Sequence, residues 1–151
     1  VGAGISRQPG EPGNHDAMPD HGERHGVVGK VAAHDLGQPR RETAAFARLR
    51  TMNPDAAFLY TRGGEGASLH VGAQTWRARP PKIEVVDTVG AGDCSLAGLL
   101  ISLMHRADAG WAEHLRASIA AGAGACLAAG ATPPSQDTVT RLAAEVEVVL
   151  G

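Results

Sequence analysis

The chain has 151 residues, of which 43% are hydrophobic, and this length suffices for one domain with its own core. Its net charge of −2, from 14 basic and 16 acidic residues, gives no electrostatic case for binding nucleic acid or an anionic membrane. No apolar run approaches the roughly 18 residues of a membrane span, and the first residues show no secretory signal, so we expect a cytoplasmic protein without a membrane partner.

Residues 1–40 differ in composition from the rest of the chain. They are dense in Gly, Pro, His and Arg, contain few large apolar residues and show no sustained period of two or 3.6 residues. Such a segment cannot bury enough apolar surface to offset the conformational entropy that ordering costs. We therefore predict a low-order, disordered leader over residues 1–40 and a folded domain over residues 41–151.

Strands and helices alternate in the predicted domain. A helix is expected over residues 41–52, because Ala45, Leu49 and Met52 share one helical face. Short strands are expected over residues 57–61, 67–71, 74–79 and 82–86. Helices follow over residues 93–105, 112–128 and 135–150, the last with Ser135 as its N-cap and an apolar stripe of valine and leucine. This alternation favours an α/β fold, a sheet covered by helices.

A glycine turn separates the first two predicted strands. Its residues, 62–66, read Arg-Gly-Gly-Glu-Gly between two apolar runs. Any hairpin can carry such glycines, so by itself the turn predicts a change of chain direction and no activity.

A second glycine segment joins the strand expected over 82–86 to the following helix. Residues 87–93 read Asp-Thr-Val-Gly-Ala-Gly-Asp. Gly90 and Gly92 let the backbone approach a ligand closely, and the free amides and dipole of the helix start favour an anion. Asp93 would repel a bound phosphate, so it makes more sense as a base for a hydroxyl that attacks phosphorus. The segment predicts phosphoryl transfer to an alcohol, and the alternative is a plain glycine turn followed by an acidic residue.

Residues 87–93 resemble the C-terminal signature of the PfkB/ribokinase family of carbohydrate kinases. In that family the last aspartate is the catalytic base, and the amides of the Gly-Ala-Gly run form the anion hole for the transferred phosphoryl group. The resemblance assigns the base, which also contacts the sugar hydroxyl, to Asp93. It assigns the anion hole to Gly90, Ala91 and Gly92.

The glycine turn is similar to the family's Thr-x-Gly-x-x-Gly segment, which lies along the nucleotide phosphates. Thr61, Gly63 and Gly66 occupy the matching positions, and we favour ATP contact over a plain hairpin there. Ile119 aligns with a position near the adenine that is often asparagine in the family. Ser95 stands where the family usually has phenylalanine. Both are departures from the family pattern.

The resemblance also implies a cation site. The first aspartate of the signature and nearby carbonyls often hold a monovalent cation such as K+ in the family, so Asp87 and the carbonyl of Val89 are candidate ligands. The alternative role of Asp87 is to cap the loop amides, and the sequence does not separate the two.

The resemblance covers residues 41–151 and implies the C-terminal portion of a ribokinase-like three-layer αβα sheet. It implies ATP and Mg2+ as cofactors, a small sugar as substrate and a homodimer in a full-length form. The family's N-terminal half, which supplies a lid and most sugar contacts, has no counterpart in this sequence. Two functions therefore stay open: an ATP-dependent sugar kinase with Asp93 as general base, or a truncated, catalytically inactive remnant that binds nucleotide.

Overall fold

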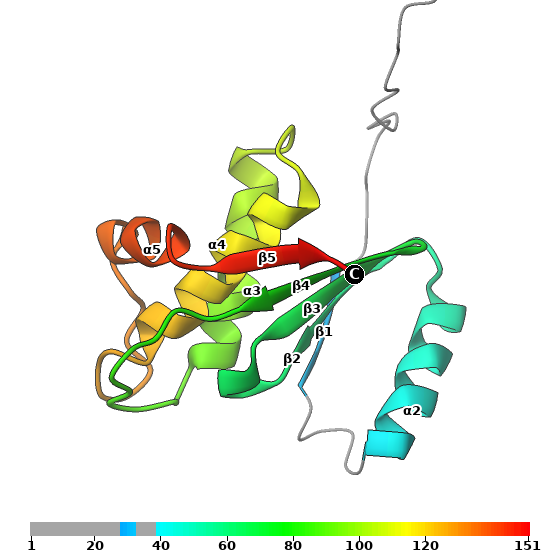
Figure 1. The fold of residues 1–151 in the computed structure, drawn as a ribbon, viewed down its shortest axis with the longest axis horizontal. Helices are drawn as coiled ribbons and strands as arrows, with labels where there is room; N and C mark the ends of the chain where they lie inside the picture. Colours follow the sequence, from blue (N-terminus) through cyan, green and yellow to red (C-terminus); the bar gives the residue numbers. More distant parts are fainter. Residues whose placement is uncertain (1–27, 33–38) are drawn as a thin grey trace, which may run out of the picture.

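The structure of the chain is a computed structural model that describes residues 28–32 and 39–151 (Figure 1). In chain order its elements are β1 (Val28–Ala32), α2 (Pro39–Met52), β2 (Ala57–Thr61), the 3-10 turn η1 (Gly63–Glu65), β3 (Ala67–Val71), β4 (Gln74–Arg79), α3 (Ala91–His105), α4 (Trp111–Ala125), α5 (Gln136–Ala143) and β5 (Glu147–Leu150). The bounds of β2, β3 and β4 are those predicted from the alternation of apolar and polar residues.

The strands form one mixed sheet in the order β1-β2-β3-β4-β5. β1 and β2 are parallel, and the remaining neighbours pair antiparallel. Helices α3, α4 and α5 lie on one face of the sheet and α2 on the other, so the described chain has three layers (Figure 1). The predicted αβα architecture is therefore confirmed.

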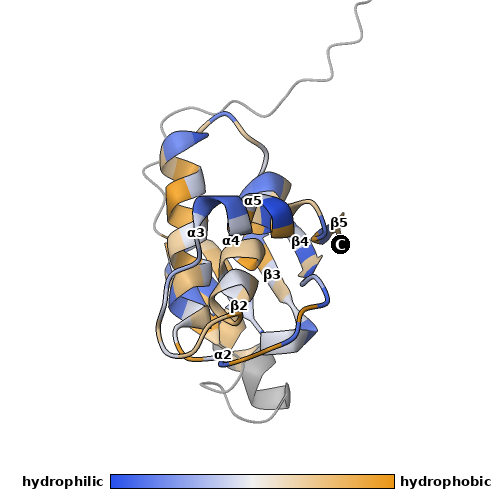
Figure 2. Ribbon diagram, turned by 90° about the vertical axis from the view of Figure 1, so that its left-hand side faces the viewer, coloured by the Kyte–Doolittle hydropathy of each residue, from blue (hydrophilic) through white to orange (hydrophobic). Residues whose placement is uncertain are grey.

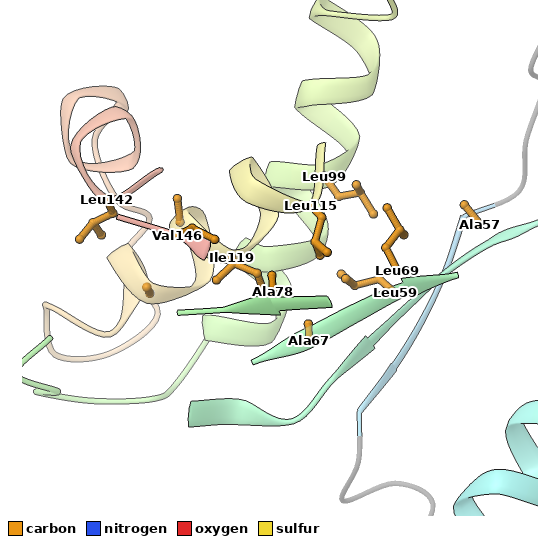
Figure 3. Packing of buried hydrophobic residues seen from close by; sticks show 12 residues of the cluster. Ala57, Leu59, Ala67, Leu69, Ala78, Leu99, Leu115, Ile119, Leu142 and Val146 are labelled. Carbon is orange, nitrogen blue, oxygen red and sulfur yellow. The ribbon is translucent and has the colours of Figure 1, made fainter. Parts of the chain in front are cut away.

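The core lies between the sheet and the pair α3 and α4. Leu59 and Leu69 project from neighbouring strands toward Leu99 of α3 and Leu115 of α4, and all four are fully buried (Figure 3). Alternation along each strand sends every second residue to this face, which is why β2 and β3 each contribute their odd-numbered side chains.

Helices α3 and α4 pack unusually close because small residues meet at their contact. A Cβ added to Gly98 would lie 2.7 Å from Cβ of Ala121, and one added to Gly122 would lie 2.1 Å from Oγ of Ser95. The Ser118 hydroxyl donates to the Ser95 carbonyl at 2.9 Å and fastens the two helices here. This contact fixes the start of α3, which carries the second glycine segment.

The face opposite the core is covered by one aromatic side chain of α2. Phe46 contacts the rings of Phe58, Tyr60 and His70, with centroid distances of 5.8, 5.7 and 4.6 Å. Met52, predicted to lie on the buried stripe of this helix, is 67% exposed, so that part of the stripe is wrong. Met52 is the last residue of α2, and its side chain is left largely exposed where the helix ends.

One strand, and the first two residues of a helix, lie within the segment that composition assigns to a low-order leader. Val28–Ala32 forms β1, which pairs with β2, and α2 begins at Pro39. A composition averaged over forty residues hides a five-residue strand that β2 stabilises by pairing. The rest of the predicted leader lies outside the described residues.

Two predicted elements are corrected by the structure. Residues 82–86 form no strand: Pro80 and Pro81 precede them and cannot donate to a ladder, and the amide of Val86 bonds instead to the Cys126 carbonyl at 2.8 Å. The last predicted helix ends at Ala143, and Glu147–Leu150 forms β5 against β4. Its valines suit a strand as well as a helix, and the free edge of β4 decides between them.

Among the described residues, the outer side of α3 is apolar and exposed. Hydrophobic colour extends along this helix in Figure 2, and Leu100, Ile101 and Met104 are exposed there. Nevertheless, none of the helices in the described ranges combines the length and apolarity that crossing a bilayer requires.

Candidate functional site

A cleft of about 830 Å³ opens at the carboxyl ends of β1 and β2. Ala32 and Thr61, which pair across β1 and β2, line it, and the same row of small paired residues continues into the core with Ala67 and Ala78. The row beside it carries Leu59 and Leu69, which fill the space beneath α4. Because the small row cannot fill that space, a cavity remains where open α/β sheets commonly bind ligands.

The turn after β2 forms one wall of the cleft. Thr61, Gly63 and Gly66 all line it, as the resemblance implies for nucleotide-binding residues. Gly66 has φ +97°, and a Cβ there would lie 2.1 Å from the Ala78 carbonyl oxygen. The hairpin backbone therefore requires glycine at position 66 by itself, whereas Gly63, with φ +54°, has open space around it and favours glycine through its backbone conformation only.

The start of α3 forms the facing wall. Gly90 is the N-cap with φ +80°, a conformation that favours glycine. The Ala91 amide donates to the Thr88 carbonyl at 3.2 Å and the Cys94 amide to Gly90 at 2.9 Å. The amides of Gly92 and Asp93 are thus the first-turn donors left without a backbone acceptor in the part of the chain that the structure describes.

Of the predicted anion hole, Ala91 and Gly92 line the cleft, and Gly90 lies just outside it. Because the Ala91 amide already has a carbonyl acceptor, the amide of Gly92 is the most available of the three. The predicted base, Asp93, lies in the first turn of α3 beside the cleft, and its side chain is 94% exposed.

Lys30 of β1 reaches the same place from the sheet. Its Nζ lies 3.9 Å from Oδ1 of Asp93, and its side chain is only 20% exposed. Gly92 leaves room for this ammonium group, since a Cβ there would lie 2.5 Å from Nζ. The sequence analysis missed Lys30, although a lysine within an otherwise apolar strand is a usable signal.

The Asp87 carboxylate fastens the loop that precedes α3. Oδ1 accepts from the Val89 amide at 3.1 Å, and Oδ2 accepts from the Gly130 amide at 2.8 Å. These bonds, the Val89 amide first, lower the pKa of Asp87 from its ordinary value of 3.8. Asp87 therefore caps loop amides, and each oxygen keeps a lone pair with which it could also face a cation.

Helix α4 supplies the third wall. Ile119 lines the cleft and also belongs to the core, so it offers an apolar surface and no hydrogen bond from its side chain. Cys126 lines the cleft at the end of α4, and burial together with the nearby Asp87 charge raises the pKa of its thiol. Ser95, the other departure from the family pattern, also lines the cleft, and its Oγ occupies the space that a Cβ on Gly122 would need.

The charge of the cleft is one-sided. Its described lining contains the basic residues Lys30, Arg62 and Lys82 and no acidic residue. Arg62 lies over the Tyr60 ring, and its buried Nε has no hydrogen-bond partner within the described chain. With the open start of α3, this charge distribution suits a polyanion, and the apolar wall at Ile119 suits a flat ring.

Comparison with known proteins agrees with a cleft that binds a polyanion. Residues 32–138, well over half of the chain, match the family model described as pfkB family carbohydrate kinase. The chain is 32% identical over 127 residues to aminoimidazole riboside kinase of Salmonella typhimurium, which covers 80% of this chain and 39% of that protein. It is 36% identical over 66 residues to 1-phosphofructokinase of Escherichia coli, covering 44% of this chain and 21% of that protein.

Solved structures confirm the fold. Aminoimidazole riboside kinase from Salmonella enterica, complexed with aminoimidazole riboside and an ATP analog, matches with a TM-score of 0.66 at 31% identity, over 78% of this chain and 42% of that chain. Phosphofructokinase-2 from Escherichia coli in complex with potassium matches with a TM-score of 0.67 at 23% identity, over 78% and 40%, a likeness of fold alone. The chain thus spans about two fifths of the length of these proteins.

Proposed function

Because the chain belongs to the pfkB family of carbohydrate kinases, we propose that it carries the nucleotide-binding and catalytic part of an ATP-dependent kinase that phosphorylates a sugar hydroxyl. One observation carries this proposal. Asp93 lies at the open amides of the α3 start, beside a cleft with three basic and no acidic side chains among its described lining residues. An anion site with the Asp93 carboxylate beside it fits phosphoryl transfer to an alcohol.

The proposed mechanism divides the work between the two walls of the cleft. Thr61, Gly63 and Gly66 lie along the nucleotide phosphates, and the apolar Ile119 faces the base. Asp93 accepts the proton of the sugar hydroxyl while that oxygen bonds to the γ-phosphorus and the bond to ADP breaks. The amide of Gly92 and the dipole of α3 stabilise the negative charge on the transferred group.

Mg2+ enters this proposal with the nucleotide. The described lining residues offer it no carboxylate, which fits an ion held mainly by phosphate oxygens and water. When bound, it screens the charge of the phosphates.

A monovalent cation such as K+ is proposed at the loop before α3. Asp87 would hold it through the lone pairs that its two amide contacts leave free, together with the Val89 carbonyl. There the cation would add positive charge next to the anion-binding loop.

The exposure of Asp93 supports a second candidate for the chain on its own. A carboxylate that is 94% exposed has no neighbour among the described residues that would hold a sugar hydroxyl against it. The chain alone would then bind nucleotide without phosphorylating sugar. Because the relatives are more than twice as long, activity of a whole kinase remains part of the proposal.

The catalytic assignment is tested in a form completed with the N-terminal half of a relative. Asp93→Asn should lower kcat by about 10²–10⁴-fold, because the amide cannot accept the proton, while the KM for ATP does not rise. Asp108→Asn, which alters another exposed aspartate beyond the end of α3, is the matched control and should leave kcat unchanged. Near-normal turnover of the Asp93→Asn variant would contradict the proposal.

The second candidate has its own test. The unaided 151-residue chain should bind ATP and show no sugar phosphorylation above background. Robust phosphorylation of any sugar by this chain alone would exclude a role limited to binding.

A further inference from the structure

Lys30 occupies an unusual position in the sheet. Strand register places it in one row with Leu59, Leu69 and Trp76, all on the face that packs against the helices. Leu59 and Leu69 are fully buried members of the core. A lysine in such a row is exceptional, because burying an ammonium group without a strong partner is costly. Packing alone therefore does not explain this residue.

The partner of Lys30 is also a poor one. Its distance of 3.9 Å to Asp93 is longer than a hydrogen bond, and the Asp93 side chain is almost fully solvated. Exposed ion pairs of this kind contribute little to stability. An ammonium group has three donors, so this contact leaves Lys30 with bonding capacity that points at the cleft.

The groups around Lys30 are themselves positively charged. Lys30 lies at Gly92, in the first turn of α3, where the helix dipole is positive and disfavours a cation. Arg62 and Lys82 line the same cleft, which has no acidic residue among its described lining. This arrangement is electrostatically unfavourable until an anion enters.

We propose that Lys30 is a phosphate-binding residue that exchanges partners: it pairs with Asp93 in the free protein and moves onto the γ-phosphate when nucleotide binds. The inference rests on the proposed function and deepens it. Once Lys30 leaves, the Asp93 carboxylate is free to take the hydroxyl proton. The hydroxyl oxygen then bonds to the γ-phosphorus, ADP leaves, and Lys30 itself neither gains nor loses a proton.

The test uses the full chain and calorimetric titration with ATP–Mg2+, inorganic tripolyphosphate and adenosine. Lys30→Met keeps the length of the side chain and removes the charge. It should weaken ATP and tripolyphosphate binding roughly 10- to 100-fold, as expected for loss of a charged hydrogen bond, and leave adenosine binding unchanged. Lys30→Arg should restore most of the affinity. Arg141→Met, which removes an exposed positive charge from the last turn of α5, outside the cleft lining, is the matched control and should leave affinity unchanged.

A double-mutant cycle distinguishes an exchange of partners by Lys30 from a phosphate contact that is independent of Asp93. Asp93→Asn removes both the competing partner of Lys30 and a negative charge that repels phosphate, so it should tighten tripolyphosphate binding, and the gain should be clearly larger in the presence of Lys30 than in the Lys30→Met background. Equal ATP affinity of Lys30→Met and the unaltered chain would overturn the inference, as would an equal loss of adenosine binding. If the unaltered chain binds neither ATP nor tripolyphosphate, the proposed function itself fails.

Discussion

The two faces of the sheet are closed in different ways. On one face, leucines from the strands meet α3 and α4, and a row of small residues beside them leaves the cleft open. On the other face, Phe46 of α2 contacts three rings of the sheet, those of Phe58, Tyr60 and His70. All the residues that we connect with chemistry lie on or beside the first face.

The histidine on the aromatic face has a shifted pKa but no functional role in our account. His70 lies on the aromatic face, and its pKa is lowered to about 4 by burial and then by Arg50, Arg77 and Arg62. Its ring nitrogens are occupied by the hydroxyls of Ser68 and Thr75 at 2.9 and 3.1 Å. The lowered pKa of His70 is therefore a consequence of its packing and does not indicate a functional site. The cleft is distinguished instead by its open cavity and by basic lining residues without acidic partners in the described lining.

The largest expected effect is on the leucine row. Leu69→Ala should lower the free energy of unfolding by about 2–5 kcal/mol, since Leu69 is fully buried between the sheet and two helices. Phe46→Ala, on the opposite and partly exposed face, should cost less. Chemical denaturation of both variants measures the difference, and a larger loss for Phe46→Ala would reverse the ranking of the two faces.

Next comes the close contact of α3 and α4. Gly122→Ala should destabilise the fold by about 1–3 kcal/mol, because the new Cβ would lie 2.1 Å from Oγ of Ser95. Gly64→Ala is the control, since nothing lies within 4 Å of a Cβ there. If thermal unfolding shows the two variants to be equally stable, the tight contact does not hold the start of α3.

A smaller effect is expected from pH on the aromatic face. The folded pKa of His70, about 4, lies below the ordinary 6.5, so only the unfolded chain binds a proton between these values. Stability contributed by neutral His70 is complete above about pH 6.5 and falls as the pH drops toward 4, by about 1–2 kcal/mol once solvent screening is allowed for. His70→Gln should flatten this part of the denaturation profile. An unchanged pH dependence in that variant would contradict the assignment.

The smallest effect concerns a helix end away from both faces. Ser135 caps α5, its Oγ accepting from the Thr138 amide at 3.2 Å. Ser135→Ala should cost about 1 kcal/mol and Ser135→Asp should largely preserve stability, as capping requires. Equal melting temperatures for all three proteins would show that this cap is dispensable.

Local signals predicted the parts of the fold that depend on neighbours in sequence. Alternation and turn glycines gave β2, β3 and β4 with their observed bounds, and Ser135 was recognised as a cap. Pairing between distant segments is invisible to such signals. Residues 82–86 pair with no strand of the described sheet and are therefore not a strand. Glu147–Leu150 pairs with the edge of β4 and is therefore a strand.

In the candidate site, too, local segments were predictable from the sequence and contacts between distant segments were not. The two glycine segments could be named from their residues, and the structure brings Thr61, Gly63, Gly66 and Gly92 to one cleft. Lys30 was missed because its neighbour Asp93 lies far along the chain, and only the fold joins β1 to the start of α3. The roles of all these residues stay predictions.

The most direct test of the central claim is an ATP–Mg2+ titration of the chain followed by amide NMR. The account predicts saturable shifts at the cleft, at Thr61, Gly63, Gly66 and Gly92, with the aromatic face around Phe58 and His70 unaffected. Absence of saturable shifts up to millimolar nucleotide, or shifts confined to the aromatic face, would contradict it.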